Sequence, residues 1–259
     1  MTTQLFIADI DGCLGEAYQP YGLDGVRALS ELAAEAGAPD ANDERPAVSL
    51  CSGRAYPYVE AVTQMLDLRA PVLFESGGGM FDLREAEVTW NPTFTDETER
   101  ALNEVGRWLR EEITPNSPLM FDYGKRTQRG VVGDDRESIA EAAPRVRDHV
   151  ERRHDELCAY ATSVSVDVLA EGITKRQALA WIADHLSLDL NEVAYIGDTE
   201  GDLGALASVG RSFAPANAEA SVREAVDHVT DAPQIEGTLE AYRACLERNR
   251  KAPQAANAV

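Results

Sequence analysis

The stretch LFIADIDGCL, residues 5–14, decides the fold. An apolar run from Leu5 to Ala8 is followed at once by Asp9 and Asp11, with Gly12 behind them. Such a run, ending in two acids one residue apart, predicts a buried strand whose carboxyl end presents both carboxylates to a crevice. Two carboxylates this close repel each other unless a cation or a shared proton relieves them. Asp and Gly also favour turns, so the pair taken alone is equally consistent with an ordinary turn.

Other segments repeat this form further along the chain. The apolar runs at residues 47–51 and 193–196 also end in polar residues, and between them TKRQALAWIADHL opens a helix-like stretch. The polar residues concerned are Ser52, Lys175, Asp198 and Asp202. Because the carboxyl ends of parallel strands meet at one edge of a sheet, where ligands bind, we expect these side chains to converge there with the first pair.

In this order, DIDGCL, LCSGR, GITKRQAL and IGDTEGD resemble the four motifs of the haloacid dehalogenase (HAD) superfamily of phosphohydrolases. Any one of these short motifs is weak evidence, whereas four in order and in context are strong evidence. The resemblance implies an α/β fold: a Rossmann-like, three-layer core with a parallel sheet, into which an α+β cap is inserted. PVLFESGGGMFD and FAPANAEASVREAVDHVTD look most like the branch of archaeal-type phosphoglycolate phosphatases. Cys13, Ser76 and Gly201 stand where the family usually has Thr, Asn and Asn.

The family resemblance also implies a role for each carboxylate. Asp9 would attack phosphorus and form an aspartyl-phosphate, and Asp11 would protonate the leaving oxygen and later accept a proton from water. The implied cofactor is Mg²⁺, which prefers hard oxygen ligands. The family places it on the Asp9 side chain, the Asp11 main-chain carbonyl and Asp198, with Asp202 nearby.

The same resemblance assigns the phosphate contacts to Ser52 and the amide that follows it, at Gly53, and a fixed positive charge to Lys175. Composition makes this lysine notable, because the chain has three lysines against 21 arginines. A lysine kept where arginine is used almost everywhere else suggests a need for a compact ammonium group. The competing interpretation is a solvated lysine at the start of a helix.

Between the second and third motifs the pattern changes. Two charged helices are expected, at residues 96–112 and 135–153, together with strand-like PLMFDY, RGVVG and SVSVDVL. We therefore expect residues 1–81 and 172–259 to form the catalytic core and residues 82–171 to form a cap that selects the substrate. The last helix is expected to end near Glu247, with a frayed tail from about Arg248.

Side chains that bind the rest of the substrate are harder to choose. GKRTQRG, residues 124–130, puts three cations between two strands, and we select Arg129 because an arginine fork suits a carboxylate or a second phosphate. Arg54 is expected either to face the site or to pair with the acidic surface. Asn217 is expected to line the pocket, although Asn before a helix is also an ordinary N-cap. A solvated hairpin tip is an equally good interpretation of each cation of the loop.

Composition limits the function classes. The chain has 259 residues, a net charge of −21 and no stretch apolar enough for a membrane span, so we expect a cytoplasmic protein that binds neither membranes nor nucleic acid. The four cysteines show no zinc spacing. Few lysines and many acids also resemble proteins from salt-loaded cytoplasms. The oligomeric state is left open.

The sequence thus predicts a Mg²⁺-dependent phosphatase that acts on a small phosphorylated metabolite, with phosphoglycolate first and sugar phosphates next. One alternative is a phosphotransferase similar to phosphomannomutase, whose cap would have to hold a second phosphate. Another is a non-catalytic protein that binds a phosphate ligand, supported only by Gly201 and Cys13.

Overall fold

The computed structural model describes residues 2–39, 44–162 and 164–251. Its α-helices are Leu23–Ala36 (α1), Tyr56–Met65 (α2), Asp96–Trp108 (α3), Arg136–Glu151 (α4), Lys175–His185 (α5), Leu203–Leu206 (α6), Ala220–Ala225 (α7) and Gln234–Lys251 (α8). Its strands are Leu5–Ala8 (β1), Ala47–Leu50 (β2), Val72–Phe74 (β3), Gly79–Asp82 (β4), Glu87–Trp90 (β5), Met120–Phe121 (β6), Gln128–Val132 (β7), Leu157–Ala161 (β8), Ser165–Ala170 (β9), Val193–Ile196 (β10), Arg211–Ala214 (β11) and His228–Val229 (β12).

The central sheet is parallel throughout, in the order β12-β11-β10-β1-β2. Strand β1 lies between β10 and β2 and is buried on both faces. Phe6 and Ala8 pack into the cluster under α1 and α8, whereas Leu5 and Ile7 pack into the cluster under α5. A strand covered on both sides is apolar at every position, which explains the unbroken LFIA run. The predicted three-layer α/β core is confirmed.

The edge beside β2 continues into a second sheet. A parallel bridge joins Cys51 to Leu73, and β3 then pairs antiparallel with β4, which pairs with β5. Sequence analysis missed β4 and β5. The boundary between core and cap that we predicted at residue 82 stays a prediction. Strand β5 lies beyond that boundary in the sequence, but it pairs with β4 and so belongs to the second sheet of the core.

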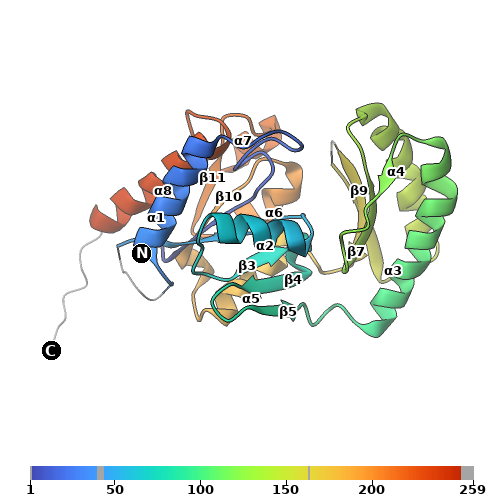
Figure 1. The fold of residues 1–259 in the computed structure, drawn as a ribbon, viewed down its shortest axis with the longest axis horizontal. Coiled ribbons are helices and arrows are strands. Elements are labelled where there is room, and N and C mark those ends of the chain that lie inside the picture. The colour runs from blue at the N-terminus through green and yellow to red at the C-terminus, as the bar shows by residue number, and fades with distance from the viewer. Residues whose placement is uncertain (1, 40–43, 163, 252–259) are drawn as a thin grey trace.

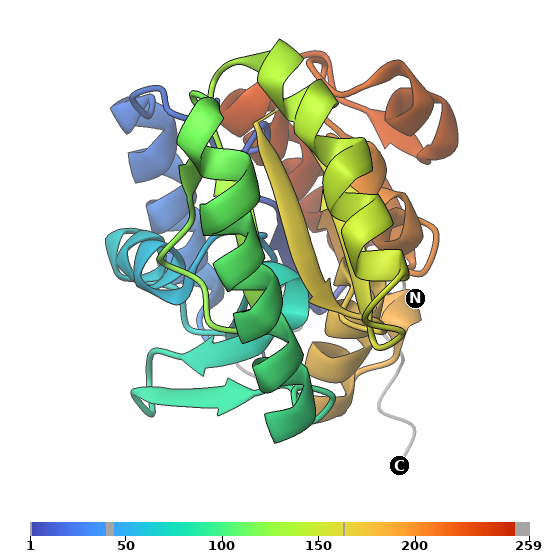
Figure 2. The same cartoon turned by 90° about the vertical axis from the view of Figure 1, so that its right-hand side faces the viewer.

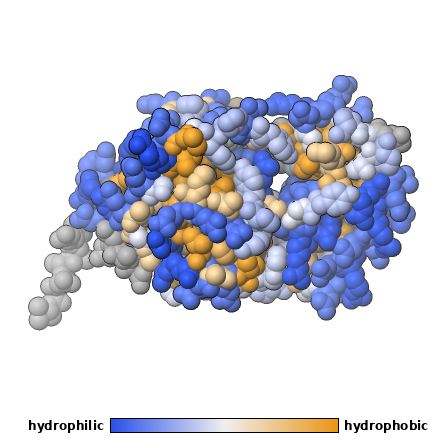
Figure 3. All heavy atoms as spheres, viewed as in Figure 1, coloured by the Kyte–Doolittle hydropathy of each residue, from blue (hydrophilic) through white to orange (hydrophobic). Residues whose placement is uncertain are grey.

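The inserted α+β unit has its own core. Strands β6-β7-β9-β8 form an antiparallel sheet, and α3 and α4 cover one face of it. Figure 1 shows this sheet between the parallel core and the two helices, and Figure 2 shows α3 and α4 in front of it. The other face of the sheet therefore looks toward the core. In the space-filling view a hollow separates the two lobes (Figure 3).

The prediction of a frayed tail from about Arg248 was partly wrong. Helix α8 continues to Lys251, and Asn249 is buried, where its amide donates to the Thr3 carbonyl at 2.7 Å. Residues 252–259 lie outside the described part of the chain. Within that part, no helix combines the length and the apolar character needed to cross a lipid bilayer.

Candidate active site

Two strands and one helix of the core bring carboxylates and a lysine to one point. Asp9 follows β1, Asp198 follows β10, and Lys175 is the first residue of α5, whose N-cap is Thr174. Lys175 donates from Nζ to Asp9 Oδ2 and to Asp202 Oδ1, each at 2.6 Å. Asp9 and Asp202 are both buried. The ammonium group thus lies between two carboxylates at the strand ends, where the sequence predicted convergence.

Among the described residues, Asp198 carries a buried carboxylate oxygen without a protein partner. Its Oδ1 is buried and has no hydrogen bond within the described residues, although an unpaired buried oxygen is costly. The backbone leaves room for it: Gly12 has φ +77°, and a side chain there would collide with the Asp198 carboxylate. Ligand oxygens of Asp9, Asp198 and Asp202 lie within 4.8 Å of one another. A hard divalent cation fits this donor set, because it would satisfy the unpaired oxygen and offset the repulsion.

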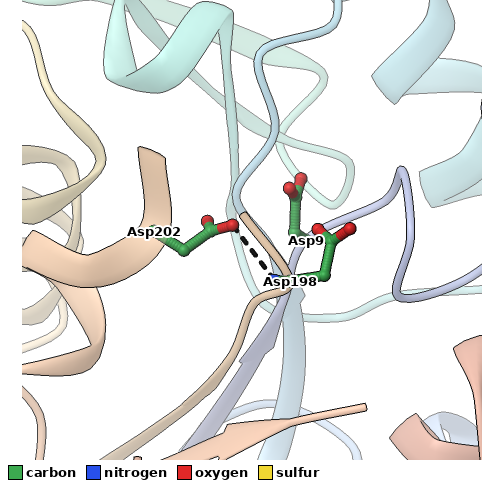
Figure 4. Close-up of side chains that lie close together, drawn as sticks. All are labelled: Asp9, Asp198 and Asp202. Atoms are coloured by element: carbon green, nitrogen blue, oxygen red, sulfur yellow. Dashed lines mark hydrogen bonds between the residues drawn. The ribbon is translucent and has the colours of Figure 1, made fainter. Parts of the chain in front are cut away.

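Figure 4 shows how the three aspartates differ. The Asp9 and Asp198 carboxylates extend side by side, whereas Asp202 approaches from the other side and bonds the Asp198 main chain. Asp202 Oδ2 accepts from the main-chain N–H of Asp198 and from the N–H and hydroxyl of Thr199, each at 3.1 Å. Its Oδ1 accepts from Lys175 at 2.6 Å and Tyr195 at 2.5 Å. Asp202, predicted as a metal residue, is therefore engaged in fixing the loop and Lys175.

Burial sets the protonation of the cluster. Desolvation, together with the negative charges of Asp9 and Asp202, raises the pKa of Asp198 to about 8. Burial also raises the pKa of Asp9, against the opposing charge of Lys175. For Asp202 burial is outweighed by Lys175 and by the hydrogen bonds it accepts, so its pKa is lowered. Carboxylates with such divergent pKa values are typical of sites that transfer protons or bind cations.

The second motif lies beside this cluster. Ser52 is buried at the end of β2, and its Oγ accepts from the Arg54 N–H at 3.3 Å. The nearest atom to a Cβ placed on Gly53 would be the Ser76 hydroxyl oxygen, at 3.5 Å, so there is open space around Gly53. Arg54 bonds Asp11 through both ends of its guanidinium, from Nε at 2.6 Å and from an Nη at 2.7 Å. The predicted substrate ligand Arg54 is thus engaged with the predicted acid–base residue.

Asn217 is placed differently from the expectation. Its amide donates to the Gly12 carbonyl at 3.0 Å and accepts from the Gln234 N–H at 2.8 Å. The N-cap of α7 is Glu219, so Asn217 is not a cap either. Its side chain instead joins the loop after β1 to the start of α8, which supports the backbone next to Asp11.

The three cations of the GKRTQRG loop are all engaged with protein groups. Arg129 donates to three main-chain carbonyls and to Asn103 of α3. It lies on the same face of β7 as Val131, which packs under the cap helices, so it is not brought to the cluster. Arg126 stacks on Trp90 at 4.5 Å. Lys125 is buried and pairs with Asp167 at 2.6 Å and Asp122 at 3.7 Å.

Sequence reasoning missed how this loop is held to the core. The buried Glu75 carboxylate accepts from the N–H groups of Arg126 and Thr127, the shortest at 2.6 Å, and from the Thr127 hydroxyl at 2.6 Å. Glu75 and Ser76 both have positive φ, near 50° and 57°, which turns the chain sharply after β3. ESG was noticed only as a departure from the family motif, whereas its carboxylate connects the two lobes.

Comparisons with known proteins agree with this geometry. The haloacid dehalogenase-like hydrolase family matches residues 116–241. Phosphoglycolate phosphatase of Natronomonas pharaonis is 27% identical over 90% of this chain and 93% of its own length. The protein of the same name from Methanothermobacter thermautotrophicus is 25% identical over 91% and 95%.

Solved structures share the fold. A protein of Thermoplasma acidophilum superposes with a TM-score of 0.73 at 21% identity, covering 95% of this chain and 99% of its own. Sucrose-phosphatase of Synechocystis, solved with sucrose and phosphate, gives 0.69 at 13% identity, covering 95% and 98%. At these identities the superpositions bear on the fold alone. Its ordered motifs, its fold and these matches make the chain similar to the haloacid dehalogenase-like hydrolases.

Proposed function

We propose that this protein is a Mg²⁺-dependent phosphatase of small phosphomonoesters that works through an aspartyl-phosphate on Asp9. The observation that carries the proposal is the buried Asp9–Lys175–Asp202 cluster beside Asp198, whose Oδ1 has no partner within the described residues. The names of the curated relatives support the reaction class. The substrate's negative charge must enter an acidic protein, so the positive groups at this point carry particular weight.

Asp9, the main-chain carbonyl of Asp11 and Asp198 would hold the cation. When bound, Mg²⁺ would offset the repulsion between nucleophile and phosphate and stabilise charge in transfer. Asp202 fits a supporting role better than a ligand role, since both of its oxygens are taken by Lys175, Tyr195, Asp198 and Thr199.

The chain's own residues supply the rest of the reaction. One Asp9 oxygen forms a bond to phosphorus while the ester bond breaks, and Asp11 gives a proton to the leaving oxygen. Lys175 holds Asp9 in place and keeps it ionised despite its burial. Water then attacks phosphorus, Asp11 takes its proton, and phosphate leaves with Asp9 restored. Ser52 and the Gly53 amide are proposed to bind the phosphoryl oxygens.

Residues 82–171 are proposed as the cap that selects the leaving group. Asp167 lies between Val166 and Val168, both packed under the cap helices, so it is on the opposite face, which looks toward the core. There it accepts from Lys125 at 2.6 Å and from the Ser165 hydroxyl at 2.8 Å. This pair is proposed to contact the part of the substrate that departs.

Phosphoglycolate is the first candidate substrate, from the relatives' names. Sugar phosphates are the second, favoured by one observation: the ammonium group of Lys125 already faces two carboxylates, Asp122 and Asp167. A neutralised lysine suits hydroxyl groups better than a second anion. The same pairing argues against a mutase, which must hold a second phosphate in the cap.

Phosphate release across phosphoglycolate and a panel of sugar phosphates tests the proposal, with Mg²⁺ or a chelator present. Asp9→Asn should abolish release from every ester, while Asp184→Asn on the outer part of α5 should not. Lys125→Met should lower activity on the preferred ester and leave release from a simple aryl phosphate within about threefold. No release by the unaltered protein, in low or molar salt, would overturn the phosphatase proposal.

A further inference from the structure

The half-buried side chain of Arg54 is held by two aromatic rings and a carboxylate. Its guanidinium carbon lies 5.0 Å from the ring centre of Tyr18 and 4.9 Å from that of Tyr58. The Tyr58 hydroxyl is bonded in turn to the Tyr21 hydroxyl at 2.6 Å. Aromatic rings at this range attract a guanidinium and restrict its position. Arg54 is therefore held in place by aromatic groups before any ligand arrives.

Both ends of the Arg54 fork contact one carboxylate. Nε donates to Asp11 Oδ2 at 2.6 Å and an Nη donates to Asp11 Oδ1 at 2.7 Å. Such a paired contact fixes the plane of the carboxylate as well as its distance. A carboxylate has about four lone-pair sites, so two remain for a proton exchanged with substrate or water. The hydrogen bonds to Asp11 raise the pKa of Arg54 above its ordinary value.

The loop that supplies Tyr18 is shaped for this contact. Tyr18 has φ +61°, a conformation that a bulky side chain seldom adopts and that needs support from its surroundings. Asp11 and Gly15 form a bridge, so the same loop begins at the carboxylate that Arg54 holds. A side chain at Gly15 would press on the Tyr21 ring, whose hydroxyl bonds Tyr58. The turn after β1 thus brings together Asp11 and the aromatic groups around Arg54.

We propose that Arg54 is a positioning residue for Asp11: held by Tyr18 and Tyr58, it orients the Asp11 carboxylate for proton exchange with the leaving oxygen. This inference rests on the proposed phosphatase function. It differs from the prediction that Arg54 binds substrate, because Arg54 would then act on the phosphate and not through Asp11. The two roles give opposite kinetic signatures.

Leaving groups separate the two roles. An alkoxide leaving from an alkyl phosphate needs a proton, whereas 4-nitrophenolate leaves without one. General acid–base catalysis contributes about 10²- to 10⁴-fold, and loss of orientation forfeits part of it. Arg54→Met should therefore lower kcat/KM on glycerol phosphate, or on the best alkyl ester of the panel, by roughly tenfold or more. It should change kcat/KM on 4-nitrophenyl phosphate by less than about threefold, because kcat/KM reports the step in which the leaving group departs, whereas kcat also contains the hydrolysis of the aspartyl-phosphate, in which Asp11 acts as base for both esters.

Four further variants sharpen the test. Arg54→Lys keeps the charge without the fork and should recover only part of the alkyl-ester rate. Tyr58→Leu should reproduce a smaller loss with the same dependence on leaving group, whereas Tyr58→Phe keeps the ring and should not. Arg45→Met removes a similar arginine–carboxylate pair, to Glu35 at 2.6 Å, remote from the site, and should leave both esters unaffected.

The outcomes distinguish the inference from the function on which it rests. If the unaltered protein releases no phosphate from either ester, the proposed function fails. If it is active but Arg54→Met lowers kcat/KM equally for both esters, Arg54 contacts the phosphate itself and the positioning role is overturned. A loss confined to the alkyl ester supports it, provided that the folded fraction measured by circular dichroism matches that of Arg45→Met.

Discussion

Replacing Lys175 by Met should destabilise the metal-free protein by about 3–5 kcal/mol near pH 8, the range typical of a buried ion pair that loses one partner. Lys175 makes two hydrogen bonds of 2.6 Å to carboxylates, and its side chain is only 11% exposed. Each bond to a charged group contributes about 1.5–3 kcal/mol, so the two together give the same order. Met fills a similar volume, and the loss is therefore mainly electrostatic.

The assay is urea unfolding in the presence of a chelator, followed by circular dichroism. Lys251→Met is the matched control: Lys251 pairs with Glu247 at 3.6 Å on the surface of α8, with the lysine 79% exposed. An exposed pair of this kind contributes about 0–1 kcal/mol. Near pH 5 the loss at Lys175 should shrink, because Asp9 and Asp198, whose pKa values are raised, can then take up protons. A loss below about 1 kcal/mol near pH 8 would refute the reasoning, since it would mean that the buried charges do not depend on Lys175.

Other predictions follow from the same contacts. Asp198 and Asp9 have folded pKa values above their ordinary 3.8, so the metal-free protein should lose stability as the pH rises from about 4 to about 8. Mg²⁺ binds these groups in their ionised form, so adding Mg²⁺ should raise the Tm of the protein more near pH 8 than near pH 6. An equal rise in Tm at both pH values would contradict this prediction. Glu75→Gln puts an amide against the N–H groups of Arg126 and Thr127, which should cost about 1–3 kcal/mol and speed hydrogen exchange of both amides, whereas exposed Glu97→Gln should do neither. Because the net charge is −21, molar KCl should raise the urea midpoint by screening repulsion, and an unchanged midpoint would argue against the salt-adapted interpretation.

Much of the core could be predicted because its signals are local. The run Leu5 to Ala8 is apolar on both faces and ends at Asp9, which defines a buried strand without knowledge of its neighbours. Lys175 was singled out by the order of the motifs, by its place at the start of a helix-like stretch and by the rarity of lysine in the chain. Parallel sheets add the rule that strand ends meet at one edge, so the convergence of Asp9, Lys175 and Asp198 was predictable from order alone.

The cap side chains could not be predicted in the same way. In the run Arg129-Gly130-Val131-Val132 two adjacent residues are apolar valines. The pattern therefore does not show whether the odd-numbered or the even-numbered residues of this strand face the cap helices. The structure puts Val131 there and Arg129 with it, which leaves Lys125 and Asp167 toward the core.

The hydrogen-bond partners of Asn217 and Asp202 could not be predicted for a related reason. Each has a polar side chain whose partners are chosen by folding: Asn217 bonds Gly12, far away in sequence, and Asp202 accepts from several donors that meet only in the folded loop. A motif shows that a carboxylate or amide is present, but not how many of its hydrogen-bonding sites remain free for a ligand.

The claim at the centre of this account is that Asp9 becomes phosphorylated. The most direct measurement is borohydride trapping during turnover, followed by mass spectrometry of the peptide that contains residues 5–14, because borohydride reduces an acyl phosphate of aspartate to homoserine. We predict homoserine at position 9 with both Mg²⁺ and substrate present, and none when either is left out. Steady release of phosphate with an unmodified Asp9, or with homoserine at another position, would contradict it.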